Sequence, residues 1–121
     1  MRNVFWLREG AIAGRSGPNR AYSCVPLSDA APPLPGDLQT CVDALPKALR
    51  FVLSEIESER CVLVHCTSGK DRTGMFLTYY LCATEGLAPT RAIEEVRRVR
   101  PVALSAEGWE TFTLDVMREL V

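Results

Sequence analysis

The sequence predicts an α/β domain in which a small, largely parallel sheet is flanked by helices. Short apolar runs bounded by glycine, proline and polar residues alternate with longer segments that repeat apolar residues at helical spacing. One such run, Cys61–His65, leads through a polar loop into the apolar segment that starts at Gly74. The order strand, loop, helix is typical of sheets that are covered by helices.

Length and composition favour a single domain, residues 1–121. A chain of 121 residues can bury one core without a metal ion or disulfide bonds. The net charge of -1 offers no basic field for a nucleic acid. No apolar run approaches the ~20 residues that cross a membrane, and the first residues lack the long apolar region of a signal peptide. We therefore expect neither a nucleic-acid partner nor a membrane span.

The cysteine content predicts a reducing compartment. The chain has five cysteines, an odd number, with one histidine and no pair of cysteines spaced for zinc. This pattern argues against a disulfide scaffold and a metal site, so we expect a cytoplasmic protein. Four cysteines stand in apolar surroundings and are expected to be small buried side chains: Cys24, Cys41, Cys61 and Cys82.

The first 26 residues predict short strands. Val4–Leu7 and Ala11–Ala13 form a hairpin around Glu9 and Gly10, and Gly14–Asn19 is a loop by its composition. Ser23–Pro26 is expected to be a further strand of the core.

A proline-rich loop and a long helix are expected next. Leu27–Asp37 is stiffened by its prolines, and Asp37 stands where the N-cap of a helix belongs. Leu38–Glu57 repeats apolar residues at helical spacing and predicts an amphipathic helix. Pro46 lies inside this pattern, so the helix should kink or divide there.

Two helices are expected after the polar loop. The segment from Gly74 is too long and too apolar to be anything but a buried helix, and Gly86 marks its end. Thr90 is expected to cap a short helix, 91–100, that Pro101 ends.

The C-terminal part of the sequence predicts that the helix over 91–100 ends in a cluster of cations and that one more helix follows. Three arginines suit the negative end of the short helix: Arg97, Arg98 and Arg100. Ser105 is expected to cap the last helix, whose apolar residues belong to the core: Trp109, Phe112, Leu114, Val116 and Leu120.

The stretch from Val62 to Gly74 carries the residues that predict chemistry. Its apolar start turns polar at His65, and five residues separate Cys66 from Arg72. A strand that leads through a tight loop into a helix aims backbone N–H groups and the positive helix end at one point, where an anion binds. A thiol and a guanidinium then flank the same anion. This is the chemistry of a cysteine nucleophile that attacks a phosphate.

Each residue type suits one role. A cysteine at a helix N-terminus beside a cation has a pKa of about 3.5–7.5, so Cys66 is expected to be a thiolate. The Arg72 guanidinium can donate to two phosphoryl oxygens at once. Thr73 brings a hydroxyl group beside the sulfur, where it can stabilise the sulfur as a leaving group. His65, the only histidine, is expected to brace the loop through hydrogen bonds.

The segment His65–Gly74 resembles the phosphate-binding loop of the cysteine-based protein tyrosine phosphatase superfamily, and is most similar to its compact dual-specificity members. Its Gly-Lys-Asp-Arg-Thr-Gly core also resembles bacterial tyrosine phosphatases and phosphoinositide phosphatases. The resemblance implies a reaction without a cofactor. It also implies that the loop holds the substrate phosphate through Thr67, Ser68, Gly69, Lys70, Asp71 and Arg72.

The resemblance also points to a general acid. A phosphatase needs an acid that protonates the leaving oxygen and later a base that activates water. Asp29 opens the sequence Asp-Ala-Ala-Pro-Pro, which resembles the Asp-x-x-Pro-Pro loop of phosphoinositide and related phosphatases. Asp37 is the alternative. The tryptophan-proline-aspartate form of this loop, found elsewhere in the superfamily, is absent.

The predicted activity is hydrolysis of a phosphomonoester through a phosphocysteine intermediate. Phosphotyrosine or mixed protein substrates are favoured, with a phosphoinositide or inositol phosphate as the alternative. Lys70 adds a cation to the loop, as in phosphoinositide phosphatases, while Asp71 offsets its charge. A phosphate-binding module without turnover is the other alternative. A P-loop NTPase is excluded because Asp71 follows Gly-Lys where that motif needs serine or threonine.

One departure from the family concerns the sheet. Family members usually place a helix and another strand between the loop that follows the first core strand and the loop that carries the acid. In this chain these loops are Gly14–Asn19 and Leu27–Asp37, and few residues separate them. Because an uncovered sheet edge invites pairing with another chain, we hypothesise a homodimer.

Overall fold

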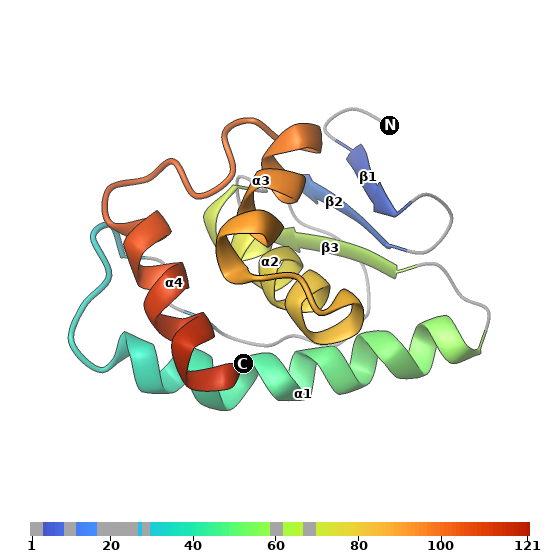
Figure 1. The fold of residues 1–121 in the computed structure, drawn as a ribbon, viewed down its shortest axis with the longest axis horizontal. Coiled ribbons are helices and arrows are strands. Elements are labelled where there is room, and N and C mark those ends of the chain that lie inside the picture. Colours follow the sequence, from blue (N-terminus) through green and yellow to red (C-terminus); the bar gives the residue numbers. More distant parts are fainter. Residues whose placement is uncertain (1–3, 9–11, 17–26, 28–29, 59–61, 67–69) are drawn as a thin grey trace.

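The sheet is formed by β1 (Val4–Arg8), β2 (Ile12–Ser16) and β3 (Val62–Cys66). The computed structural model describes residues 4–8, 12–16, 27, 30–58, 62–66 and 70–121. Within these ranges the chain forms three strands and four helices, which follow the order β1, β2, α1, β3, α2, α3, α4 (Figure 1). The strand expected at Ser23–Pro26 lies outside the described residues.

The strand register brings Cys66 to the carboxyl end of a parallel pair. β1 pairs with β2 antiparallel, as the predicted hairpin requires, and β2 pairs with β3 in parallel. The parallel register aligns Ile12 with Val62 and Ser16 with Cys66. The expectation of a loop from Gly14 was wrong, because pairing with β3 extends β2 to Ser16. The α/β class is confirmed, with one parallel and one antiparallel pair among the described strands.

Helix α1 (Asp37–Glu57) forms the longest element and runs along one side of the molecule (Figure 1). It continues through Pro46, so its predicted division was wrong. Buried side chains on both sides of the proline hold it in place: Cys41, Leu45 and Val52. The N-cap is Gly36 at φ 94, not Asp37, which is the first helical residue. Glycine adopts this left-handed conformation without a steric penalty.

Helix α2 (Asp71–Glu85) lies at the centre of the fold and contacts β3 and each of the other three helices (Figure 1). Every residue from Thr73 to Cys82 is buried, which confirms the predicted core helix. Gly86 ends it at φ 69, as expected. The helix begins at Asp71 and not at Gly74, and this earlier start places Arg72 and Thr73 in its first turn.

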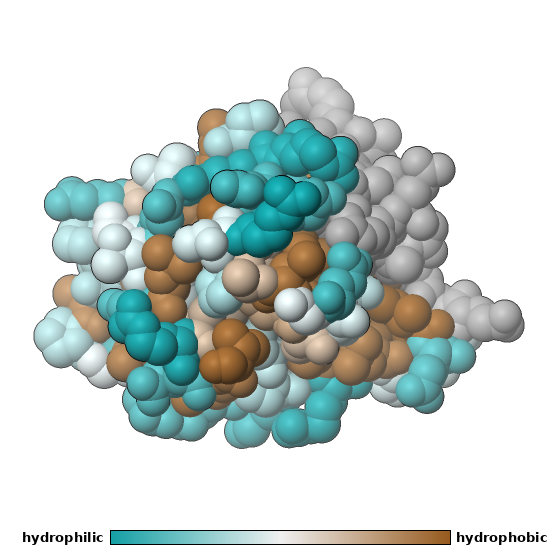
Figure 2. Space-filling view, viewed as in Figure 1, coloured by the Kyte–Doolittle hydropathy of each residue, from teal (hydrophilic) through white to brown (hydrophobic). Residues whose placement is uncertain are grey.

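Helices α3 (Pro89–Val99) and α4 (Trp109–Leu120) complete the fold. Thr90 does not cap α3: the N-cap is Ala88, and Pro89 takes the first helical position, to which its fixed φ is suited. Ser105 does not cap α4 either, because a turn over 101–104 and the left-handed Gly108 delay the helix. The outward face of α3 is strongly hydrophilic (Figure 2).

The core gathers around α2. Trp109, Met75, Leu77 and Leu81 are among its largest fully buried side chains. Cys41 and Cys82 are buried too, in agreement with their predicted role as small apolar side chains. Cys24 and Cys61 lie outside the described residues. In the part of the chain that the structure describes, no helix is long and apolar enough to cross a membrane.

Candidate active site

The sulfur of Cys66 sits at the beginning of α2. Cys66 is the last residue of β3, and its Sγ atom accepts two hydrogen bonds from Thr73. The hydroxyl group of Thr73 donates over 3.0 Å and its backbone N–H over 3.4 Å. Thr73 is 1% exposed, so both donors are held rigidly. Donors that converge on a sulfur at a helix N-terminus stabilise its anionic form.

The connection between α3 and α4 also holds the beginning of α2. The carbonyl of Lys70 accepts hydrogen bonds from the N–H groups of Gly74, at 3.1 Å, and Leu104, at 3.3 Å. The Asp71 carboxylate accepts the N–H of Ala106 over 3.2 Å. The connection between α3 and α4 therefore fixes the turn in which Arg72 and Thr73 lie.

Arg97 holds that connection in place. Its guanidinium donates to the carbonyls of Ala103, at 2.9 Å, and Leu104, at 3.4 Å, and to the Glu110 carboxylate at 2.7 Å. The predicted role of Arg97 at the negative end of α3 is thus incomplete, because its side chain joins α3 to the next loop and to α4. Arg98, by contrast, pairs with Glu95 on the same helix and is exposed.

The structure brings together part of the predicted site. Cys66 and Thr73 meet at the junction of β3 and α2, and Arg72 lies half-buried in the first turn of α2. The Lys70 ammonium lies 3.7 Å from the Asp71 carboxylate, so the two neighbouring charges form an ion pair. Four residues of the predicted site lie outside the described residues: Asp29, Thr67, Ser68 and Gly69. The side chain of His65 is not described either.

Asp37, the alternative acid, has a structural partner. Its carboxylate accepts the N–H of Leu34 over 2.6 Å, and its own N–H donates to the carbonyl of Leu34 over 3.0 Å. This reciprocal pair closes the turn that leads into α1. A carboxylate at the first turn also suits the positive end of the helix. The Asp37 side chain therefore has a role in starting α1.

Several residues of the site could not be inferred from the sequence. Leu104 and Ala106 act through their backbone N–H groups, which any residue except proline would offer. The sequence placed Arg97 near the end of a helix, but this position suggested only an interaction with the helix dipole. Only the folded chain shows that these residues support the beginning of α2.

Comparison with known proteins shows the family of this chain. The family described as "Dual specificity phosphatase, catalytic domain" matches residues 10–113. The chain therefore belongs to the dual specificity phosphatase family through this catalytic domain. This match confirms the resemblance that the segment His65–Gly74 suggested.

Individual relatives share shorter stretches. The chain is 36% identical over 59 residues to the RNA/RNP complex-1-interacting phosphatase of Bos taurus, which is 49% of this chain and 18% of that protein. It is 28% identical over 78 residues to the human phosphatidylglycerophosphatase and protein-tyrosine phosphatase 1, which is 64% of this chain and 37% of that protein. The chain thus spans well under half the length of these curated relatives.

A solved structure shares the fold over almost the whole chain. The crystal structure of Tk-PTP in its active form superposes with a TM-score of 0.72 at 23% identity. The superposition covers 98% of this chain and 96% of that one. This likeness shows that the two chains share one fold.

Proposed function

We propose that this domain hydrolyses phosphomonoesters through a phosphocysteine intermediate on Cys66. The observation that carries the proposal is the pair of hydrogen bonds from Thr73 to the Cys66 sulfur at the first turn of α2. A thiol in a structural core has no need for two converging donors. A thiolate that serves as nucleophile and later as leaving group gains from both of them. Membership of the dual specificity phosphatase family supports the same reaction.

In the first step the Cys66 thiolate attacks phosphorus. A sulfur–phosphorus bond forms while the bond from phosphorus to the ester oxygen breaks. Asp29 gives its proton to the leaving oxygen, so the alcohol leaves neutral. The Arg72 guanidinium and the N–H groups of the loop at 67–69 hold the equatorial oxygens, on which the charge of the transition state is spread.

In the second step water attacks the phosphocysteine. The Asp29 carboxylate, now ionised, takes a proton from this water. The sulfur–phosphorus bond breaks, and inorganic phosphate and the thiolate are released. The hydroxyl and N–H groups of Thr73 stabilise the charge that returns to the sulfur.

The contacts at the first turn favour Asp29 over Asp37 as the acid. The Asp37 carboxylate accepts the Leu34 N–H and so closes the turn that begins α1. A general acid must instead reach the leaving oxygen of the bound substrate. Asp29 carries the sequence resemblance to the acid of related phosphatases.

We propose a phosphorylated protein as the substrate, with phosphotyrosine included. The ion pair of Lys70 and Asp71 lowers the net positive charge beside the loop, which suits a phosphoryl group without further phosphates nearby. A phosphoinositide is the second candidate, because the Gly-Lys-Asp-Arg-Thr-Gly core resembles phosphoinositide phosphatases and one relative bears the name of a phosphatase for another phospholipid, phosphatidylglycerophosphate. A thiolate nucleophile requires a reducing compartment such as the cytoplasm. Pairing of two copies through a sheet edge stays a prediction, to be checked by light scattering.

The experiment measures phosphate release from a phosphotyrosine peptide and from a phosphoinositide between pH 4 and 8. Wild type, Cys66→Ser and Asp29→Asn are compared. We expect release from the peptide to vanish in Cys66→Ser and to fall about 10²-fold in Asp29→Asn. Faster release from the phosphoinositide would select the lipid substrate instead. If the folded wild type bound phosphate without any turnover, the domain would be a phosphate-binding module.

A further inference from the structure

The start of α4 lies against the segment that follows Asp29. The indole N–H of Trp109 donates to the carbonyl of Ala30 over 2.9 Å, between residues 79 positions apart in the chain. Trp109 is 1% exposed and Ala30 is half-buried, so the donor of this hydrogen bond belongs to the core. The Phe112 ring meets the indole edge to face at a centroid distance of 5.4 Å, which fixes the indole orientation.

Gly108 lets the two segments approach closely. It takes φ 80, which favours glycine, and an added Cβ would lie 3.1 Å from the Pro32 Cβ and 3.2 Å from the Pro33 Cδ. Both distances are shorter than ordinary van der Waals contacts. The prolines therefore pack directly on the Gly108 backbone, one residue before the indole anchor.

The connection between α3 and α4, which contains Gly108, also contacts the beginning of α2. The N–H groups of Leu104 and Ala106 bind the Lys70 carbonyl and the Asp71 carboxylate. The segment Ala103–Trp109 thus contacts the turn of Thr73 at one end and the segment Ala30–Pro33 at the other. A mechanism with a thiolate and a separate acid needs these two parts in fixed relative positions.

We propose that Trp109 is a positioning residue for the general acid. Asp29 precedes Ala30 directly in the sequence, so the hydrogen bond to the Ala30 carbonyl anchors the chain at the residue next to the acid. The indole acts through the backbone and does not touch the substrate. This inference rests on the proposed function, and specifically on Asp29 as the proton donor.

The test uses aryl phosphates that differ in their need for a proton. Phenyl phosphate has a poor leaving group, so its cleavage depends on the acid, whereas 2,4-dinitrophenyl phosphate expels a stable anion. In Trp109→Phe the aromatic ring stays and the N–H is lost. We expect kcat/KM to fall about 10-fold for phenyl phosphate and less than about twofold for the dinitrophenyl ester. Asp29→Asn should show the same selective loss for phenyl phosphate, with a larger fall in kcat/KM.

Phe112→Leu is the matched control, because it alters the packing of the indole and keeps its N–H. Thermal unfolding is recorded for each variant. Equal losses on both esters in Trp109→Phe, or the same selectivity in Phe112→Leu, would show a merely structural role and overturn the proposal. If Trp109→Phe does not fold, Gly108→Ala replaces it, since it displaces the prolines with the indole intact, and the same selectivity is expected.

These variants distinguish a failure of the role of Trp109 from a failure of the proposed function. Selectivity in Asp29→Asn without selectivity in Trp109→Phe overturns the role of Trp109 and leaves the proposed function standing. Absence of selectivity in Asp29→Asn removes Asp29 as the acid, and the role of Trp109 with it. No turnover of either ester by folded wild type overturns the proposed function itself.

Discussion

The hydroxyl group of Thr73 lies 3.0 Å from the sulfur of Cys66, and the backbone N–H of the same threonine points to that sulfur from 3.4 Å. Strand β3 supplies the sulfur and the first turn of α2 supplies both donors. Because Thr73 is buried, this pair exists before any substrate binds. The arrangement is preorganised for a charge that leaves the sulfur and returns to it.

Thr73→Val should slow the release of phosphate from the enzyme. Valine keeps the shape of threonine and removes the hydroxyl donor, while the backbone N–H stays. We expect kcat to fall by about 10²-fold, as for the loss of one preorganised donor. Rapid-mixing experiments should show a burst of alcohol before the slow steady state.

Thr73→Ser is the control, because it keeps the hydroxyl and removes only a methyl group. It should retain most of kcat. A burst that is absent in Thr73→Val, or a loss of kcat in Thr73→Ser of equal size, would contradict the role of the hydroxyl in breakdown of the intermediate.

Arg97→Gln should destabilise the domain. Its guanidinium binds two carbonyls of the α3–α4 connection and the Glu110 carboxylate, so its removal leaves these groups without their donor. We expect a loss of about 1–3 kcal/mol in the free energy of unfolding, measured by urea denaturation. The Michaelis constant should also rise, since the beginning of α2 loses support.

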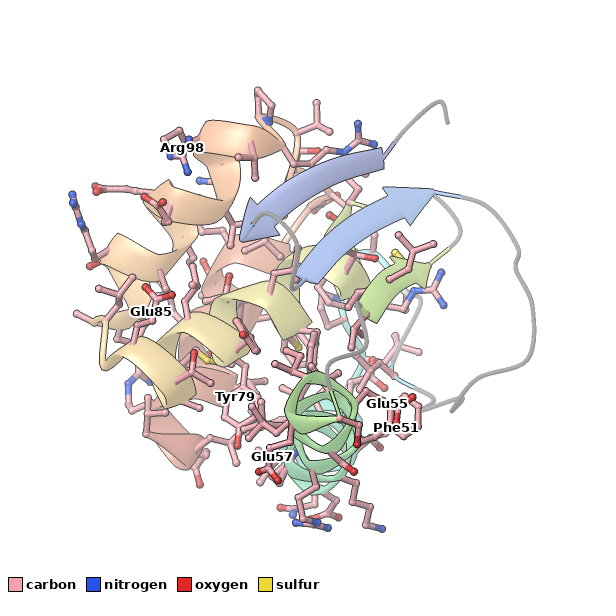
Figure 3. The ribbon with its side chains drawn as sticks, turned by 90° about the vertical axis from the view of Figure 1, so that its right-hand side faces the viewer. Phe51, Glu55, Glu57, Tyr79, Glu85 and Arg98 are labelled. Carbon is pink, nitrogen blue, oxygen red and sulfur yellow. The ribbon has the colours of Figure 1, made fainter. Side chains whose placement is uncertain are left out.

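Arg98→Gln provides the matched control on the same helix. Arg98 lies on the outer side of α3 (Figure 3) and pairs with Glu95, a neighbour one turn away on the same helix. Exposed pairs of this kind contribute little, so the change should stay within about 0.5 kcal/mol. Equal effects of the two substitutions would refute the bridging role of Arg97.

Gly74→Ala should not give the stabilisation that alanine usually brings to a helix interior. An added Cβ would lie 3.2 Å from the Leu104 Cδ2 and 3.3 Å from the Ala103 Cβ. This crowding outweighs the helix propensity gain of about 1 kcal/mol. A double-mutant cycle with Leu104→Ala should show favourable coupling in urea denaturation, and strict additivity would contradict the close approach.

The stability of the fold should decline at alkaline pH. Burial raises the pKa of the Cys82 thiol above its ordinary value of 9.0. Burial also raises the pKa of Tyr79 above 10.0, partly opposed by the charge of Arg50. Figure 3 shows Tyr79 on the side of α2 that faces α1, the helix of Arg50. Both groups are neutral when protonated, so the folded state keeps its protons at pH values where the unfolded chain loses them.

Their contribution is therefore complete below about pH 9 and is lost as the pH rises through the raised values. Urea denaturation at several pH values should show this loss. Cys82→Ala and Tyr79→Phe should each flatten the alkaline slope of the unfolding free energy. A slope that neither substitution changes would assign the decline to other groups.

The local part of the site was predictable from the sequence. Cys66, Arg72 and Thr73 stand within one strand–loop–helix unit, whose geometry follows from short-range patterns. The helix caps were predicted less well, because Gly36 and Gly108 start helices in a left-handed conformation where Asp37 and Ser105 seemed chemically better suited. Backbone conformation decided these positions.

The long-range contacts could not be predicted. The bond from Trp109 to Ala30 joins residues 79 positions apart, and Arg97 reaches backbone carbonyls that no motif marks. Such contacts depend on how α3 and α4 pack, and a single sequence carries no signal for that packing. The same reason explains why Pro46 did not divide α1, since buried neighbours on both sides hold the helix together.

The most direct test is to trap the covalent intermediate. Wild-type protein is mixed with excess 2,4-dinitrophenyl phosphate, quenched in acid within milliseconds, digested and analysed by mass spectrometry. We predict one phosphoryl group on the peptide that contains Cys66 and none in Cys66→Ser, with release of phosphate abolished in that variant. Release of phosphate that persists in Cys66→Ser, or turnover with no phosphoryl group on this cysteine, would contradict the account.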